Sequence, residues 1–301
     1  MIRRLWPLLA AALAFASIAQ AQVAAPELVP AAPRHFAPSL LSFNGATVTP
    51  DNPAALQWSA PSAAAFGLFN HTSETPPAAP NDFSGWFVGY RGISDRFSFG
   101  LEHTAASADT GTFDESATSA QVSMQVLEGL AIGAGLDRSE WDNGTTNRQE
   151  EENTFGFSVN LAKQFYLGYA IGRDKYEENT ASTGSRDTTL YGIAFRTEGS
   201  WRWHLAYDVL DKDHYTNITS LGFDATTITV QVGVGNWVFG AQAVDFAYKG
   251  SPNDLSTTVI DVGWVPEKAG LSLTARLWDG STSGGAPSDE SGAALNLAYR
   301  Y

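Results

Sequence analysis

Hydrophobic and polar residues alternate along most of the chain, from about Pro61 to the C-terminus. In the last segment, Leu295 and Leu297 lie on one face of an extended strand, while Asn296 and Arg300 lie on the other. Similar segments recur, separated by connections that are alternately short and long. A strand of about nine to eleven tilted residues crosses a bilayer, and a closed barrel satisfies its backbone hydrogen bonds. The pattern therefore predicts an all-β fold, a transmembrane antiparallel up-and-down β-barrel.

We predict about fourteen strands, with twelve to sixteen compatible with the weak signal of each segment. The predicted strands are 62–71, 83–91, 96–104, 118–127, 130–138, 153–162, 165–175, 187–197, 201–211, 225–234, 237–248, 256–265, 270–279 and 292–301. Short connections such as 128–129 and 235–236 suit periplasmic hairpins. Long polar connections such as 139–152 and 176–186 suit the extracellular side. Because the two kinds alternate, both termini are expected in the periplasm.

One face of most predicted strands is apolar and is expected to contact lipid, for example Tyr191, Ile193 and Phe195. Aromatic residues beside the short turns are expected to form the lower interfacial girdle: Phe97, Phe165, Trp201, Trp237, Trp264 and Tyr301. Trp141 and Tyr176 are assigned to the upper girdle. A soluble two-sheet sandwich would also alternate, but uniform strand lengths and alternating loop lengths favour the barrel.

The opposite faces carry polar and charged residues, which we expect to line the lumen because an Arg at the bilayer midplane costs about 2–4 kcal/mol on the lipid face. The predicted lumen residues are Glu102, Asp137, Asn160, Asp174, Arg196, Arg202, His204, Asp208, Asp261, Arg276, Asn296 and Arg300. They would form either a salt-bridge network that fills the barrel or the wall of a permeation pathway. The sequence leaves both roles open.

The N-terminus has the pattern of a secretory signal peptide. Arg3 and Arg4 precede an apolar run over 8–18, and Ala19-Gln20-Ala21 forms a small-x-small cleavage site. We therefore predict a cleaved signal peptide over 1–21, a periplasmic linker and hatch over 22–61, and the barrel over 62–301. Export together with a barrel places the protein in the outer membrane of a Gram-negative bacterium.

Composition changes this picture little, because 44% hydrophobic and 17% charged residues would also suit a soluble protein. A net charge of -14 without clustered Lys or Arg argues against nucleic acid. The absence of Cys excludes disulfides. The expected partners are outer-membrane lipid and lipopolysaccharide, the barrel-assembly machinery acting on the C-terminal strand that ends at Tyr301, and an unidentified small solute. We expect a monomer.

Catalytic signals are weak. His204 and Asp208 are the strongest candidate pair, but a spacing of four on a strand puts them roughly 13 Å apart, beyond hydrogen-bond reach. We expect no enzyme, no cofactor and no metal site. The acidic stretches Glu150-Glu151-Glu152 and Glu177-Glu178 are interpreted as a solvated outer surface that tolerates divalent cations.

The stretch 45–56, Gly-Ala-Thr-Val-Thr-Pro-Asp-Asn-Pro-Ala-Ala-Leu, resembles the pre-barrel region of the FadL-type (OMPP1/TodX-like) outer-membrane transporters. The resemblance implies a hatch in the periplasmic mouth that contains Asn52, Pro53, Ala54 and Leu56. It also implies fourteen strands, a ligand site inside the barrel, a lateral opening and passive movement of hydrophobic molecules such as long-chain fatty acids. This chain is shorter than typical members, and its long loops lack the apolar helical segments that form an external capture groove.

The sequence therefore predicts an outer-membrane channel or transporter for passive uptake of small molecules, hydrophobic ones among them. Acidic loops and lumen carboxylates favour a first alternative, a hydrophilic and weakly cation-preferring porin. A second alternative is a structural or adhesive barrel with a sealed lumen, in which the loops act.

Overall fold

The computed structural model of the chain describes residues 52–58, 62–74, 81–94, 96–108, 114–142, 144, 147–161, 164–179, 181–197, 200–216, 222–249, 254–266, 270–283 and 289–300. The signal peptide predicted over 1–21 and the linker up to residue 51 lie outside the described residues. Among the described residues, no helix is both long enough and apolar enough to cross a membrane.

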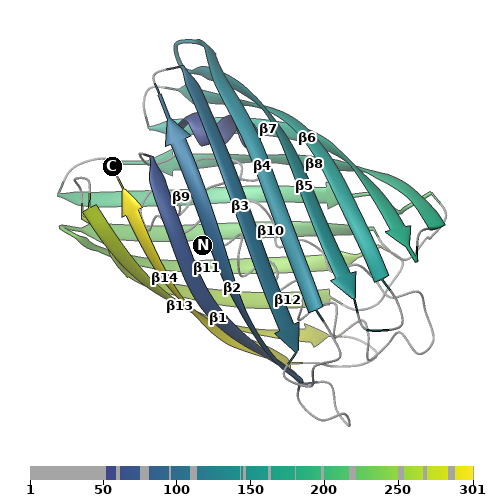
Figure 1. Ribbon diagram of the computed structural model, residues 1–301. Helices are drawn as coiled ribbons and strands as arrows, with labels where there is room; N and C mark the ends of the chain where they lie inside the picture. The colour runs from purple at the N-terminus through teal and green to yellow at the C-terminus, as the bar shows by residue number, and fades with distance from the viewer. Residues whose placement is uncertain are drawn as a thin grey trace.

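Fourteen antiparallel strands form one closed barrel, in which each strand pairs with its sequence neighbours and β14 pairs with β1 (Figure 1). The fold class and the strand number predicted from the alternation are confirmed. The strands are β1 (Ala63–Glu74), β2 (Asn81–Ile93), β3 (Phe97–Ala108), β4 (Asp114–Leu127), β5 (Leu130–Asp142), β6 (Asn147–Leu161), β7 (Phe165–Glu178), β8 (Ala181–Arg196), β9 (Trp201–Lys212), β10 (Phe223–Val234), β11 (Trp237–Tyr248), β12 (Asp254–Trp264), β13 (Gly270–Ser283) and β14 (Asp289–Arg300). A 3₁₀ helix, η2 (Pro53–Trp58), precedes them.

Several strands extend well beyond the segments predicted for them. The connections predicted over 139–152 and 176–186 are largely strand, because β5 continues to Asp142, β6 begins at Asn147 and β8 begins at Ala181. Their acidic composition suggested loops. Charged side chains are compatible with a strand here, however, since Glu150 and Glu152 lie on the inward face and find cationic partners.

The barrel wall is continuous over the described residues. The strand pairs from β14 through β1, β2 and β3 to β4 show no register shift. Register shifts occur between Gln125 and Leu127 on β4 and between Tyr176 and Glu177 on β7, close to strand ends. The lateral opening that the resemblance implies therefore does not correspond to a break in these strand pairs.

The outer surface is an apolar belt that suits lipid. Large hydrophobic side chains on alternate positions are exposed, as at Leu68, Ile193 and Leu277. The predicted lower girdle is exposed beside the short turns at Phe97, Phe165, Trp201, Trp237 and Trp264, whereas Tyr301 lies outside the described residues. Tyr176 was wrongly assigned to the upper girdle. It is fully buried on the inward face of β7, where its hydroxyl donates a hydrogen bond to Glu178 Oε2 at 2.7 Å.

A charge placed on the outward face should destabilise the barrel according to its depth. We predict that Ile260→Arg, near the middle of β12, lowers the free energy of unfolding by about 2–4 kcal/mol, because it puts a guanidinium in the hydrocarbon core. Asp254→Arg, on the same face at the strand's start, should cost only about 0–1 kcal/mol. Denaturant titration in lipid vesicles, read by heat-dependent gel mobility, measures both. Equal losses for the two variants would contradict the transmembrane orientation.

Candidate functional site

The lumen is where the structure places the predicted polar residues. Seven of them are buried on inward positions: Glu102, Asp174, His204, Asp208, Asp261, Arg276 and Asn296. Asp137, Asn160, Arg196 and Arg202 are partly buried on the same face. The side chain of Arg300 lies outside the described residues. Two of the predicted residues meet directly, since Arg276 Nη2 donates to Asp261 Oδ2 at 2.6 Å.

The element η2 begins where the sequence resemblance placed a hatch. Pro53 fixes the backbone for the first turn. Asn52 closes that turn twice, because its Oδ1 accepts from the Ala54 amide at 3.0 Å and its carbonyl accepts from the Ala55 amide at 2.9 Å. Figure 1 shows η2, in purple, inside the ring of strands at the end where the C-terminus lies. It contacts the inner wall formed by β3 to β7.

Polar contacts hold η2 against this wall. The Asn52 amide donates to the Phe157 carbonyl at 2.9 Å. Gln57 accepts from Ser98 Oγ at 2.7 Å, and the Trp58 indole donates to Ser158 Oγ at 3.1 Å. Residues 52–56 are completely or almost completely buried, which includes Pro53, Ala54 and Leu56 of the predicted hatch.

Two glycines of the wall allow this close approach. A Cβ on Gly133 would lie 2.5 Å from the Ala54 nitrogen and from the Pro53 carbonyl carbon. A Cβ on Gly156 would lie 2.1 Å from Asn52 Oδ1. Since no real Cβ tolerates such distances, any larger residue would push η2 off the wall.

A charged cluster occupies the inward face near the other end of the barrel, on β6 to β9. Arg186 donates from Nε to Asp174 and from Nη2 to Glu150, both at 2.8 Å. Lys212 Nζ lies 2.8 Å from Glu152 Oε2 and 2.9 Å from Asp174 Oδ2. All five side chains are largely or fully buried, so the loss of one partner would cost about 3–5 kcal/mol.

Tyr215, in the connection after β9, completes this cluster. Its hydroxyl donates to Glu150 Oε1 at 3.0 Å, and its ring lies under the Arg186 guanidinium at 4.5 Å. Burial and the Glu150 charge raise the pKa of the Tyr215 hydroxyl despite the opposing charge of Arg186. The hydroxyl therefore stays protonated and remains a donor at neutral pH.

The interpretation of Glu150 to Glu152 as a solvated outer surface was wrong for two of the three residues. Glu150 and Glu152 point into the lumen, while Glu151 lies on the alternate face. A signal was present, because Arg148, Glu150, Glu152 and Thr154 alternate with period two and continue the strand pattern of Phe155 and Phe157.

Apolar side chains lie among the polar ones on the lumen wall, which the sequence had suggested to be polar and small. Buried hydrophobic side chains from most strands form one connected cluster, the apolar tract, with Trp58 of η2 packed against it. Its larger members are Phe69, Phe87, Tyr166, Leu190, Leu210, Phe223, Val244, Phe246, Leu255, Val259 and Trp278. The tract meets the charged cluster at Phe223, whose ring centre is 5.7 Å from the Arg186 guanidinium.

Three aromatic rings of this tract lie flat over glycines on the neighbouring strand. Trp278 pairs with Gly292, Phe69 with Gly85, and Phe87 with Gly67 in the strand register. A Cβ on these glycines would come within 1.8 to 2.2 Å of the ring. The glycines therefore let the rings lie along the wall instead of projecting across the lumen.

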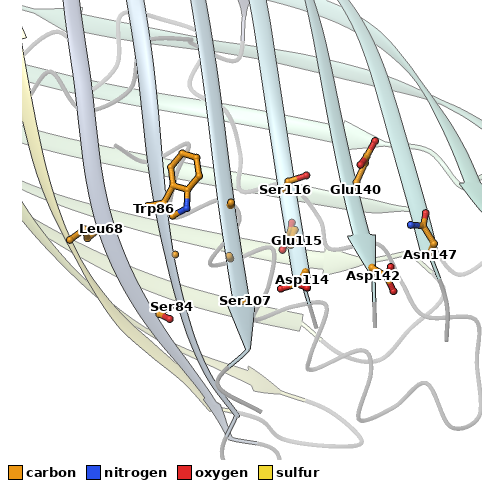
Figure 2. A pocket seen from close by; sticks show the side chains of 13 residues that line it. Leu68, Ser84, Trp86, Ser107, Asp114, Glu115, Ser116, Glu140, Asp142 and Asn147 are labelled. Atoms are coloured by element: carbon orange, nitrogen blue, oxygen red, sulfur yellow. The ribbon is translucent and has the colours of Figure 1, made fainter. Parts of the chain in front are cut away.

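A groove lies beside β1 to β6, with a cavity volume of about 670 Å³ (Figure 2). Leu68 and Trp86, both exposed on the outer face, form its apolar part. Asp114, Glu140 and Asp142 form its acidic part. The groove thus offers an apolar surface next to negative charge.

The sequence matches no family model and no curated protein. Solved structures, however, share the fold. The CymD monoaromatic hydrocarbon channel superposes with a TM-score of 0.63 at 10% identity, covering 83% of this chain and 91% of that one. A Pseudomonas aeruginosa FadL homologue gives 0.58 at 11% identity, covering 90% and 99%. The Pseudomonas putida toluene transporter TodX gives 0.58 at 10% identity, covering 88% and 98%.

The chain has the FadL-type barrel fold. CymD is a channel and TodX is a transporter, and the likeness extends over nearly the whole length of all three proteins. The FadL-type resemblance drawn from the stretch around Asn52, Pro53 and Ala54 is therefore confirmed at the level of the fold.

The close contact between Gly133 and η2 allows a test of whether η2 obstructs the lumen. We predict that Gly133→Ala displaces η2 and raises single-channel conductance, because the new Cβ meets backbone atoms of Pro53 and Ala54 that cannot rotate away. The matched control is Gly135→Ala on the same face of β5, where the nearest atom is the flexible Gln121 Cγ at 3.2 Å. Equal conductance in the two variants would contradict an obstructing hatch.

Proposed function

We propose that the protein is an outer-membrane channel through which hydrophobic molecules, aromatic hydrocarbons among them, enter the cell passively. The observation that carries the proposal is the apolar tract inside the barrel, a connected cluster of buried side chains that would contact an apolar solute moving through it. A wall of this kind stabilises apolar cargo by removing it from water, at about 25 cal/mol per Å² of buried apolar surface. Movement then needs no energy source, only a concentration gradient.

Two further observations support this proposal. The CymD monoaromatic hydrocarbon channel and the toluene transporter TodX share the fold. The aromatic rings of Trp278, Phe69 and Phe87 lie over glycines, so they occupy less of the barrel interior than rings that project from the wall would.

The lumen of a hydrophilic porin would have a different lining. Water-filled pores carry polar side chains around their whole circumference, whereas here a connected apolar cluster from most of the strands lies among the polar side chains. The helix η2 also lies inside the ring of strands. The geometry therefore supports the hydrophobic channel better than an ion-conducting pore or a barrel in which only the loops act.

Toluene uptake by cells whose outer leaflet is lipopolysaccharide tests the proposal. Cells with the barrel should take up labelled toluene several-fold faster than cells without it. Gly292→Ala should remove much of this gain, because its Cβ would lie 1.8 Å from Trp278 Cζ2 and the indole would have to turn into the lumen.

Gly263→Ala is the matched control, since it also changes an inward glycine but its Cβ would come no closer than 3.1 Å to the Thr274 side chain and 3.4 Å to Val265 Cγ2. Uptake equal to that of barrel-free cells would refute the proposed function. Normal uptake by folded Gly292→Ala would show that the solute does not pass along the apolar tract.

A further inference from the structure

We propose that the charged cluster on β6 to β9 is a charge filter at the extracellular end of the lumen, which admits neutral and cationic aromatic solutes and excludes anionic ones. This inference rests on the proposed function, because it assigns a selectivity to the same route. It concerns Glu150, Glu152, Asp174, Arg186 and Lys212, whose contacts are described above.

The position of the cluster follows from the strand directions. Glu150 and Glu152 lie near the start of β6, Asp174 near the end of β7, and Lys212 at the end of β9. All are at the end of the barrel opposite to the short turns and to η2. A solute that reaches the apolar tract at Phe223 passes the cluster, since Arg186 lies against that ring.

The charges of the cluster do not balance. Three carboxylates share two cations, so one negative charge is in excess. Both cations are occupied, because Arg186 and Lys212 each contact two or more carboxylates. An anionic solute would have to displace a buried carboxylate to gain a cationic partner, at the cost of leaving that carboxylate unpaired.

A buried carboxyl group outside these five residues adds a hydrogen-bond acceptor to this region. Glu115, on β4, is 8% exposed and close enough to Glu150 for the two carboxylates to interact. Its Oε2 is buried without a hydrogen-bond partner among the described residues. This oxygen is therefore available to a hydrogen-bond donor on a solute.

The groove beside β1 to β6 is also negatively charged. Its charged lining residues are Asp114, Glu115, Glu140 and Asp142, all acidic. The chain as a whole carries a net charge of -14, which raises the local concentration of cations and lowers that of anions near the entrance.

The test uses two probes with one aromatic ring and a permanent charge, so that neither crosses lipid in a neutral form. Phenyltrimethylammonium is the cation and benzenesulfonate is the anion. Vesicles that contain the purified full-length barrel are compared with barrel-free vesicles, and initial entry rates are measured at low ionic strength. We expect the cation to enter faster than the anion by about tenfold or more, a ratio that falls as salt is added.

The double variant Glu150→Gln/Glu152→Gln turns the excess negative charge into an excess positive one and keeps side-chain size. It should lower the cation-to-anion ratio to about one or below. The matched control, Glu151→Gln/Glu177→Gln, removes the same charge from outward-facing positions of β6 and β7 and should leave the ratio unchanged.

The outcomes separate the two proposals. If toluene enters and the two ions enter at equal rates in the wild-type barrel, the filter is refuted and the proposed function stands. If toluene does not enter, both the charge filter and the proposed function are refuted. Should the double variant fail to fold, as heat-dependent gel mobility would show, the wild-type ratio alone decides. A ratio that changes equally in the double variant and its control would also refute the cluster as the filter.

Discussion

Closure of the backbone hydrogen-bond ladder is the constraint on which the rest of the structure depends. In lipid, an unpaired peptide group is costly, so the chain must pair every strand on both sides, and β14 closes onto β1 over its full length. Once the ladder is closed, successive side chains of each strand point alternately to the lipid and to the lumen. The outward apolar belt, the inward charges and the position of η2 all follow from this division.

Inside the closed ring, limited space is the second constraint. Glycines on the wall decide where large side chains and η2 can fit. A large side chain on one strand repeatedly faces a glycine on the next, as Trp278 faces Gly292 and Gln231 faces Gly240. The same device serves two purposes. Over Gly292 and Gly85 it presses aromatic rings against the wall, whereas over Gly133 and Gly156 it admits the backbone and Asn52 side chain of η2.

The sequence predicted the barrel well, because strand length and alternation repeat fourteen times and each weak signal supports the others. It also placed Asn52, Pro53 and Ala54 before the barrel at a site that the structure finds against the inner wall. It failed where composition and period disagreed. Glu150 and Glu152 have loop composition but strand period, and the period was correct.

The apolar tract was missed for a different physical reason. On β11 both faces are apolar, with Phe239 outward and Phe246 inward, so alternation in hydrophobicity disappears although alternation in direction persists. Likewise, no single sequence shows that Arg186 of β8 meets Glu150 of β6, because such pairs depend on side chains that reach across an intervening strand. Pairing partners come from the three-dimensional register, and patterns along one strand do not contain them.

The measurement that tests the central claim most directly is an experimental structure of the barrel soaked with iodobenzene, in which the iodine is located by its anomalous signal. The account predicts iodine inside the lumen along the apolar tract, close to Phe223, Phe246 and Trp278. Iodine confined to the outer detergent belt, with none in the lumen, would contradict a hydrophobic route through this barrel.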